Sequence, residues 1–307
     1  MTGINELSAA STGSAVTIGT FDGVHLGHRA LIARTIRRAR ERGLRSVVVT
    51  WDRHPNVTLR PAYVPPLLTG ERRKLELLEE TAVDAVALVA FDEELSRLTP
   101  ETFAARVLSE GLGAGAVVVG AGWRFGHRAA GDVALLEKLG TDLGFTAEGL
   151  NLESVAGGPV SSSRARAAVT GGEVELARTL LGRPYDLDGE VIRGDGRGAS
   201  LGYPTANLDV AHALARPALG IYAGRARVGD EWHGAAISVG TNPQFQQGAP
   251  RAPRVEAFLL DFSGDLYGEA LRIELWARLR EERRFDSVEA LVAQMDSDVE
   301  ATRSLTC

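Results

Sequence analysis

The sequence predicts two domains of different class, an amino-terminal α/β domain with a doubly wound parallel sheet and a carboxyl-terminal antiparallel β-barrel with a terminal helix. Its 307 residues are enough for two domains of about 150 residues each. Apolar strand-like runs alternate with helical patterns up to residue 181, and short strand-like runs separated by turns follow Pro184, before one helical pattern at the end of the chain. We therefore expect the α/β domain over residues 1–184 and the barrel over residues 185–307.

Composition and charge exclude several classes of protein. Hydrophobic residues make up 44% of the chain and charged residues 24%, proportions typical of folded globular proteins, which excludes a disordered chain and a fibrous repeat. The formal charge of −6 argues against a nucleic-acid partner. The first 14 residues lack the basic and apolar parts of a secretion signal, and no run of 18 apolar residues occurs, so we expect a cytoplasmic protein without a membrane partner.

The only cysteine is the last residue, Cys307. A disulfide within the chain and a cysteine metal cluster are therefore excluded. The sequence leaves homo-oligomerisation open. The partners that remain to be expected are small molecules.

Each element of the first domain has its own sequence signal. Four runs rich in β-branched residues predict buried strands at residues 16–19, 46–50, 84–89 and 116–120. Apolar residues at helical spacing predict one face of a first helix: Leu31, Ile32, Thr35, Ile36 and Ala39. Two further helices are predicted at residues 99–108, where Pro100 suits the first turn, and at residues 132–139. Strands that are apolar on both faces indicate a parallel sheet covered by helices, and such sheets bind ligands at the carboxyl ends of their strands.

The second domain has a different pattern. Short strands are predicted at residues 189–193, 220–228, 234–240, 255–262 and 271–279. Their spacing and turn-rich connections predict an antiparallel barrel. Asp286, followed three residues later by Glu289, has the pattern of a capping box, so we expect Asp286 to be the N-cap of a terminal helix. The apolar face of that helix would consist of Val288, Leu291, Val292 and Met295.

The turn between the first strand and the first helix carries the sequence GTFDGVHLGH, residues 19–28. Gly23 and Gly27 allow the backbone close to a polyphosphate, and a helix N-terminus offers free N–H groups with partial positive charge. The imidazoles of His25 and His28 are able to donate hydrogen bonds to phosphate oxygens as charge grows on them, which suits in-line attack on the α-phosphate of a nucleoside triphosphate. Two histidines three residues apart are also compatible with a simple helix cap or with half of a metal site.

A second anion-binding pattern, GGPVSSSRAR, occupies residues 157–166. Its hydroxyl groups and guanidiniums open a further helix, and arginine binds phosphate through two parallel hydrogen bonds. Taken alone, the pattern also fits a serine-rich helix cap beside solvated arginines. Two such patterns in one α/β domain favour a site for a nucleoside triphosphate.

The second domain has its own glycine-rich segment, GDGRGASLGYPTAN, at residues 194–207. The Walker A spacing is absent from the chain, so this loop would hold phosphates in another way. The Thr205 hydroxyl and the Asn207 amide oxygen are hard ligands of the kind that Mg²⁺ prefers. Glu256, in the predicted strand 255–262, is the carboxylate best placed to accept a proton from an alcohol. Glycine turns between strands and an ordinary surface carboxylate are the alternatives.

Over nearly its whole length the chain resembles the prokaryotic bifunctional riboflavin kinase/FAD synthetase family. The resemblance rests on the segments FDGVHLGH (21–28), WRFGHRAAGD (123–132), SSSRAR (161–166), GRGASLGYPTANL (196–208), GIYAG (220–224), SVGTNP (238–243), VEAFLLDF (255–262) and LR…RFDSVEAL (279–291). It implies a Rossmann-like nucleotidyltransferase domain that adenylylates FMN to FAD, followed by a flavokinase barrel that phosphorylates riboflavin to FMN. Both reactions would consume ATP, with Mg²⁺ as the cofactor and riboflavin, FMN and FAD as substrates and products.

The resemblance also implies roles for individual residues. In the first domain His25 and His28 would contact the ATP phosphates. The other residues implied in nucleotide binding there are Gly19, Phe21, Asp22, Gly23, Gly27, Arg124, Ser161, Ser162, Ser163, Arg164 and Arg166. In the second domain Glu256 would take the proton of the ribityl 5′-hydroxyl group, while Trp51 of the first domain and Arg280 of the second would lie near the flavin. The residues implied at the kinase ATP site are Gly194, Gly198, Gly202, Tyr203, Pro204, Thr205 and Asn207, of which Thr205 and Asn207 would also bind Mg²⁺.

The chain departs from the family pattern at a few positions. Gly122 stands where the family usually has the asparagine of GxNFRFG, Trp51 and Arg53 change the usual TFDPHP segment, and residues 246–253 lengthen a loop. Loss of one preorganised hydrogen bond costs about 2.7–4 kcal/mol at a transition state. Two alternatives therefore stay open: a riboflavin kinase whose first domain is degenerate or retuned to another nucleotide or flavin, and a flavin-binding regulatory protein without turnover.

Overall fold

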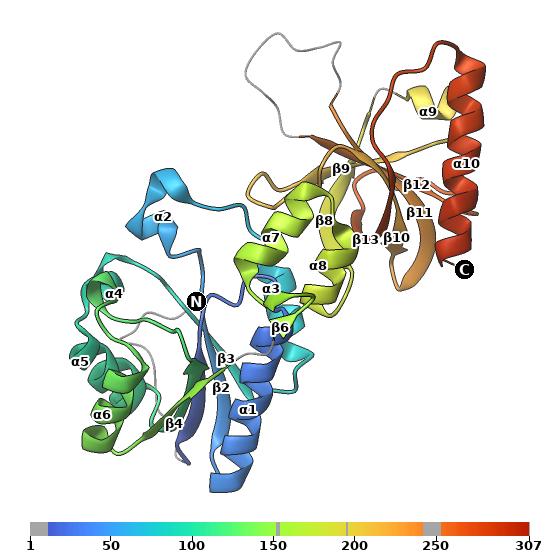
Figure 1. Ribbon diagram of the computed structural model, residues 1–307. Coiled ribbons are helices and arrows are strands. Elements are labelled where there is room, and N and C mark those ends of the chain that lie inside the picture. The colour runs from blue at the N-terminus through green and yellow to red at the C-terminus, as the bar shows by residue number, and fades with distance from the viewer. Residues whose placement is uncertain (1–11, 152–153, 195, 242–252, 307) are drawn as a thin grey trace. The chain divides into compact units, whose positions relative to one another are not determined.

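The computed structural model describes residues 12–151, 154–194, 196–241 and 253–306. The chain forms two compact units, Met1–Ser162 and Ser163–Cys307, which are described one after the other (Figure 1). Helix α8 (Val174–Leu181) and most of α7 (Ser162–Gly171) belong to the second unit, although they precede the domain boundary expected at residue 184. The division into compact units does not show to which active site α7 and α8 contribute. The boundary at residue 184 between the two functional domains therefore stays a prediction. The lengthened loop, apart from Pro253, and Cys307 lie outside the described residues.

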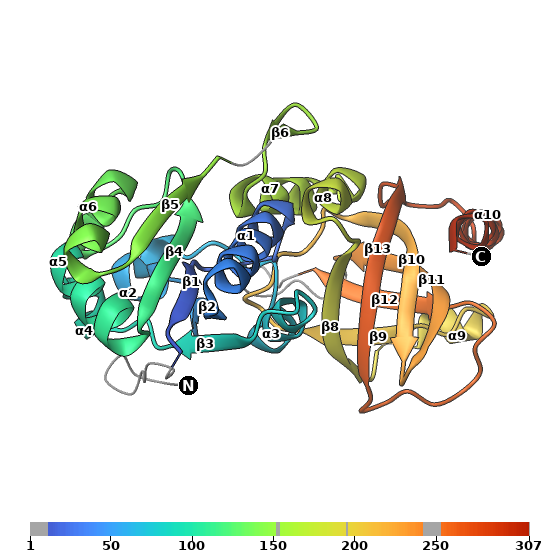
Figure 2. The same ribbon diagram turned by 90° about the horizontal axis from the view of Figure 1, so that it is seen from below.

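The first unit is built on a parallel sheet with the strand order β3-β2-β1-β4-β5 (Figure 2). Its strands are β1 (Ser14–Ile18), β2 (Arg45–Trp51), β3 (Ala85–Val89), β4 (Ala114–Gly120) and β5 (Thr146–Leu150). The strands predicted from sequence in this domain are confirmed. Strand β5 was not predicted, because it is a half-exposed edge strand whose sequence TAEGL has neither a continuous apolar run nor strict alternation.

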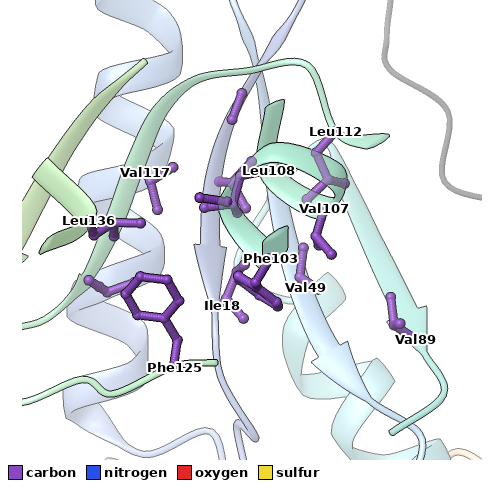
Figure 3. Packing of buried hydrophobic residues seen from close by; sticks show 14 of the residues in the cluster. Ile18, Val49, Val89, Phe103, Val107, Leu108, Leu112, Val117, Phe125 and Leu136 are labelled. Carbon is purple, nitrogen blue, oxygen red and sulfur yellow. The ribbon is translucent and has the colours of Figure 1, made fainter. Parts of the chain in front are cut away.

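Helices cover both faces of this sheet, as a doubly wound domain requires. One face packs against α1 (Leu26–Arg42) and α3 (Glu71–Glu79), and the other against α5 (Pro100–Phe103), η3 (Ala104–Gly111) and α6 (Val133–Leu143). Successive residues of a strand point to opposite faces, so Val48 and Val49 of β2 belong to two different cores. Figure 3 shows the core around Val49, where Phe103 and Leu108 pack on the sheet.

The predicted helices of the first unit are confirmed with different bounds. The helix predicted at residues 99–108 extends to Gly111, because α5 continues directly into the π-helical segment η3. The helix predicted at residues 132–139 is α6, capped by Asp132, whose Oδ1 accepts from Leu135 N at 2.9 Å. The remaining short elements are α2 (Asn56–Leu59), η2 (Pro61–Tyr63), α4 (Glu93–Arg97), η4 (His127–Ala129), β6 (Ser154–Val155) and β7 (Gly158–Pro159).

The second unit contains a closed antiparallel barrel with the strand order β10-β11-β12-β9-β8-β13. Its strands are β8 (Tyr185–Ile192), β9 (Ala206–Val210), β10 (Gly220–Val228), β11 (Glu231–Gly240), β12 (Arg254–Leu259) and β13 (Ala270–Arg280). A short helix, α9 (Arg197–Ser200), precedes β9. All of these strands except β9 were predicted. Strand β9 was missed because it begins within the PTAN motif, directly after a turn-rich segment.

Helix α10 (Val288–Thr306) packs on strands β10, β11 and β13 of the barrel (Figure 1). Its N-cap is Ser287, whose Oγ accepts a hydrogen bond from Ala290 N at 3.1 Å. The prediction that Asp286 caps this helix is therefore wrong by one residue, because the helix begins at Val288. None of the helices in the described part of the chain is both long and apolar enough to cross a membrane.

Candidate functional site

In the first unit, residues 19–28 make a tight turn between β1 and α1. Phe21, Gly23 and Val24 have positive φ angles of 49°, 82° and 38°, a conformation that costs free energy for residues with a β-carbon. The turn starts at the carboxyl end of β1, where Gly19 N donates to Val49 O at 3.1 Å. Strain of this kind persists only where the surrounding structure holds it.

Asp22 anchors the strained turn. Its Oδ1 accepts from Leu68 N at 2.8 Å and from Thr69 N at 3.1 Å, and Gly23 N donates to Thr69 Oγ1 at 3.1 Å. Asp22 is 3% exposed. These bonds tie the turn to the segment that precedes α3, so the Asp22 carboxylate positions the backbone. Direct contact with a nucleotide stays a prediction for the residues of this turn, which are Gly19, Phe21, Asp22, Gly23 and Gly27.

The two histidines lie against each other at the start of α1. His25 is the N-cap, because its Nδ1 accepts from His28 N at 3.2 Å, and the two rings stack with centroids 3.6 Å apart. Since Nδ1 accepts, a neutral His25 carries its proton on Nε2 and can donate it to a ligand. Burial lowers the pKa of His25 to about 4, while burial and the neighbouring His25 hold the pKa of His28 well below its usual range. Both rings are therefore neutral hydrogen-bond donors at neutral pH.

The tertiary structure brings Ser162 of the serine-rich segment to this turn. Ser162 Oγ donates to Asp22 O at 2.9 Å, across 140 positions of sequence. Ser161 precedes it and is half-buried. The remaining members of the pattern lie on α7 within the second compact unit, and their contact with a nucleotide stays a prediction: Ser163, Arg164 and Arg166.

The carboxyl end of β4, which is next to β1 in the sheet, carries an aromatic pair and an open position. The rings of Trp123 and Phe125 stack 4.9 Å apart with an interplanar angle of 10°. Arg124 is exposed and lies 3.7 Å from Asp132. A β-carbon added to Gly122 would meet no atom within 4 Å. The position at which the chain departs from the family pattern therefore opens onto free space.

At the carboxyl end of β2, Trp51 lies in the hydrophobic core. It is 7% exposed, and its ring packs edge-on against Phe91 at 5.3 Å, so its contact with a flavin stays a prediction. Lys74 of α3 holds this strand end, because its Nζ donates to Trp51 O at 2.6 Å, and burial lowers the pKa of Lys74. Sequence reasoning missed Lys74, since a lysine on an amphipathic helix has the pattern of a solvent-exposed residue.

In the barrel, the residues expected at the kinase site come together from neighbouring strands. Glu256 on β12 is opposite Asn207 on β9 and Ser238 on β11 in the strand register. Thr205, between the exposed Pro204 and β9, has its Oγ1 3.4 Å from Glu256 Oε2. A cavity of about 220 Å³ opens beside these groups, with Thr205, Ser238 and Glu256 in its wall together with apolar side chains of the barrel and of α10.

Two glycines of the segment at residues 194–207 are required by close approaches. A β-carbon at Gly194 would lie 2.7 Å from Asn207 Oδ1, and one at Gly198 would overlap the carbonyl oxygen of Tyr203. Gly202 has a φ of 88°, which favours glycine. Gly194 and Gly198 therefore leave the space that Asn207 and Tyr203 occupy. This structural role does not depend on any contact of these glycines with phosphates.

Another part of the cavity wall is formed by α10 and the end of β13. Arg280 donates from Nε at 3.0 Å and from Nη2 at 2.7 Å to the carboxylate of Asp298. Tyr203 donates to Asp296 on the same helix, and its ring packs edge-on against Phe258 at 5.3 Å. Sequence reasoning predicted Arg280 and Tyr203 as site residues but missed both aspartates, because acidic residues on a helix usually face solvent.

Comparison with known proteins gives consistent results along the chain. The family model described as FAD synthetase matches residues 7–164, and the one described as riboflavin kinase matches residues 181–306. The bifunctional riboflavin kinase/FMN adenylyltransferases of Listeria monocytogenes and Pseudomonas fluorescens are 36% and 37% identical to this chain. These matches cover 94% and 99% of this chain and 91% and 96% of the two relatives.

A solved structure is similar over the same length. The crystal structure described as a macrolide-efflux protein from Streptococcus pneumoniae is 30% identical, has a TM-score of 0.87, and matches over 96% of this chain and 95% of that chain. The description as an efflux protein applies to the streptococcal protein alone. Because two family models together span most of the chain and the relatives match nearly all of it, the chain belongs to the family of bifunctional riboflavin kinase/FMN adenylyltransferases.

Proposed function

We propose that this protein converts riboflavin to FAD in two consecutive ATP-dependent reactions. In the first, riboflavin and ATP give FMN and ADP, and in the second, FMN and ATP give FAD and pyrophosphate. The observation that carries the proposal is that one chain holds two separate sets of groups suited to phosphates, the stacked histidines of α1 and the Thr205–Glu256 pair of the barrel cavity. Residues 185–307 would carry the first reaction and residues 1–184 the second.

In the kinase reaction, the 5′-hydroxyl oxygen of riboflavin attacks the γ-phosphorus of ATP, the bond to the ADP oxygen breaks, and the hydroxyl proton is removed. Glu256 is the carboxylate in the cavity wall that accepts this proton. Thr205 places a hydroxyl group beside it. The apolar side chains Leu291 and Met295 of α10 and Phe258 of β12 offer a surface for the flavin ring in the same cavity. Positioning and charge neutralisation account for most of the rate of such a transfer.

The oxygen donors of Thr205 and Asn207 fit Mg²⁺, which the proposal includes. Mg²⁺ takes few protein ligands and completes its shell with water and substrate phosphates. When bound, Mg²⁺ would neutralise charge on the ATP phosphates. Gly194 leaves the space that the Asn207 amide fills.

In the adenylyltransferase reaction, a phosphate oxygen of FMN attacks the α-phosphorus of ATP and the bond to pyrophosphate breaks. No protein nucleophile is needed, because positioning and electrostatics suffice. The neutral rings of His25 and His28 donate to oxygens on which charge develops, and the N–H groups at the start of α1 add partial positive charge. Among the described residues, the buried His28 Nδ1 has no hydrogen-bond partner.

One observation favours a second candidate, a riboflavin kinase whose first domain is degenerate or retuned to another nucleotide or flavin. Gly122 offers no side chain at the carboxyl end of β4, where the family usually has an amide, and the ring of Trp51 is buried in the core. The relatives that are 36% and 37% identical are named for both activities, which weighs against this candidate.

Separation of the flavins after incubation with riboflavin, ATP and Mg²⁺ tests the proposal. We expect FMN to form first and FAD to follow. FMN without FAD, with ATP, CTP and GTP supplied in turn, would support the second candidate, and the absence of both products would rule out both candidates. We place the reactions in the cytoplasm, where the ATP that they consume is supplied.

A further inference from the structure

We propose that Asp298 is a positioning residue of the riboflavin kinase, which orients the Arg280 guanidinium for contact with the flavin. The inference rests on the kinase reaction proposed above. Arg280 and Asp298 both line the barrel cavity. Arg280, at the end of β13, donates Nε–H at 3.0 Å and Nη2–H at 2.7 Å to Asp298 on α10. Two parallel bonds of this kind fix the plane of the guanidinium.

The pair is shielded from solvent and supported by further hydrogen bonds. The side chains of Arg280 and Asp298 are 17% and 8% exposed. Gln294, one turn earlier on α10, donates Nε2–H to Asp298 Oδ1 at 2.8 Å, and Arg280 Nη1 donates to Glu281 O at 3.1 Å. Removing a charged pair from water is costly, and apolar residues in its place are often as stabilising. Because stability alone does not explain a charged pair in the wall of the cavity, the Arg280–Asp298 pair points to a role in binding the substrate.

Other ion pairs already link the barrel strands to one another and α10 to the barrel, so the Arg280–Asp298 pair is not needed for these structural roles. Arg272, also on β13, makes the same two-bond contact with Asp188 on β8 at 2.6 and 3.0 Å, and neither residue is among those that line the cavity. Arg303 of α10 binds Asp261 at 2.5 and 2.9 Å. The Arg272–Asp188 pair thus links two barrel strands, and the Arg303–Asp261 pair holds α10 on the barrel, both without lining the cavity.

Arg280 keeps donors that a flavin is able to use. The bonds described above engage one N–H of each guanidinium nitrogen, whereas arginine has five N–H groups. The others remain for the carbonyl oxygens of a planar ring such as isoalloxazine. Because the Asp298 carboxylate balances the charge of Arg280, the site offers directed hydrogen bonds without a net cation, which suits a neutral ring better than an anion.

Steady-state FMN formation by the full chain with riboflavin, ATP and Mg²⁺ tests this role. We expect Asp298→Asn to raise KM for riboflavin by about tenfold, the loss typical of one charge-assisted hydrogen bond, with KM for ATP and kcat within about twofold of wild type. Asp188→Asn is the matched control, since it removes the same charge from an equivalent pair on the same strand, and it should leave these constants unchanged. If wild type forms no FMN, the kinase proposal fails. If wild type forms FMN and Asp298→Asn behaves like Asp188→Asn, only the positioning role is overturned.

A double variant separates positioning from a general structural effect. In Arg280→Gln the group that Asp298 orients is gone, so adding Asp298→Asn should cause no further rise in KM for riboflavin. Multiplied effects would mean that Asp298 acts independently of Arg280 and would overturn the proposal. If Asp298→Asn does not fold, Gln294→Leu replaces it, because it removes the 2.8 Å bond to Asp298; the other bond that it removes is the one that Gln294 Oε1 accepts from the Arg283 guanidinium. Its smaller rise in KM should likewise disappear in the Arg280→Gln background, and persistence there would refute the role.

Discussion

Replacing Gly122 by asparagine should raise the rate of FAD formation. Gly122 lies just beyond the carboxyl end of β4, at the edge of the sheet where α/β domains bind ligands. Its backbone is not in the left-handed region, and a β-carbon there would meet no atom within 4 Å. The substitution therefore adds an amide near the proposed nucleotide site without strain and without displacing a neighbour.

The size of the gain depends on how firmly the new amide is held. A preorganised donor in a water-free site is worth about 10²–10³ in kcat. Gly122 is exposed, so an amide there must exchange bonds with water for bonds with the nucleotide, which leaves a net contribution of about 0.5–1.5 kcal/mol. At the transition state this corresponds to an increase of about two- to twelvefold in the rate.

Formation of FAD and pyrophosphate from supplied FMN and ATP measures the effect, and FMN formation from riboflavin by the same protein is the internal control. Gly43→Asn is the matched variant. Gly43 also has no atom within 4 Å of a β-carbon, and its φ of 65° at the far end of α1 is one that asparagine tolerates. An unchanged or lower rate of FAD formation in Gly122→Asn, with the kinase intact, would refute the inference that this open position weakens the nucleotide site.

Three further predictions concern the other groups of the two sites. Glu256→Gln should lower FMN formation by about 10²-fold or more and spare adenylylation of supplied FMN, whereas His28→Ala should do the reverse; loss of both activities in either folded variant would contradict separate sites. Gly194→Ala should raise the Mg²⁺ concentration needed for half-maximal kinase activity, because its β-carbon displaces the Asn207 amide, and an unchanged Mg²⁺ titration would count against Asn207 as a ligand. The pKa of His25 is about 4 in the folded protein and 6.5 for the free group. Between these two pH values His25 is protonated only in the unfolded chain, so thermal stability should fall as the pH drops from 6.5 to 4. His25→Asn, which keeps an N-cap acceptor, should show a shallower fall, and an equally steep one would argue against this origin.

Most groups of both candidate sites were predictable because they are neighbours in sequence, whereas the role of Glu256, which is 51 positions from Thr205, came from the family resemblance. The turn around His25 and His28 and the segment ending in Thr205 and Asn207 each place hydroxyl, amide or imidazole groups within a few residues of glycines. The structure confirms where these segments lie in the fold, and it adds a local reason for Gly194 in the space that the Asn207 side chain requires. The roles of these residues toward ATP and flavin stay predictions.

Other features lay beyond what local patterns indicate. Strand β9 was missed because it begins within a turn-rich motif, and the half-exposed edge strand β5 has no clear periodicity. Lys74 looked like a solvent-exposed helical residue, yet it donates to the buried end of β2. Ser287 replaced Asp286 as the cap of α10, because a shift of one residue in the start of a helix changes which side chain reaches its free N–H groups.

The sequence by itself determined the two fold classes, most strands, the main helices and the segments whose residue types suit phosphate binding. These properties depend on periodicity and on residues a few positions apart, so a short window contains them. Only the tertiary structure decided which distant side chains meet, as Ser162 does with Asp22 and Arg280 with Asp298. Such contacts depend on strand register and on the packing of helices against sheets, which arise from interactions summed over each compact unit and are present in no single segment.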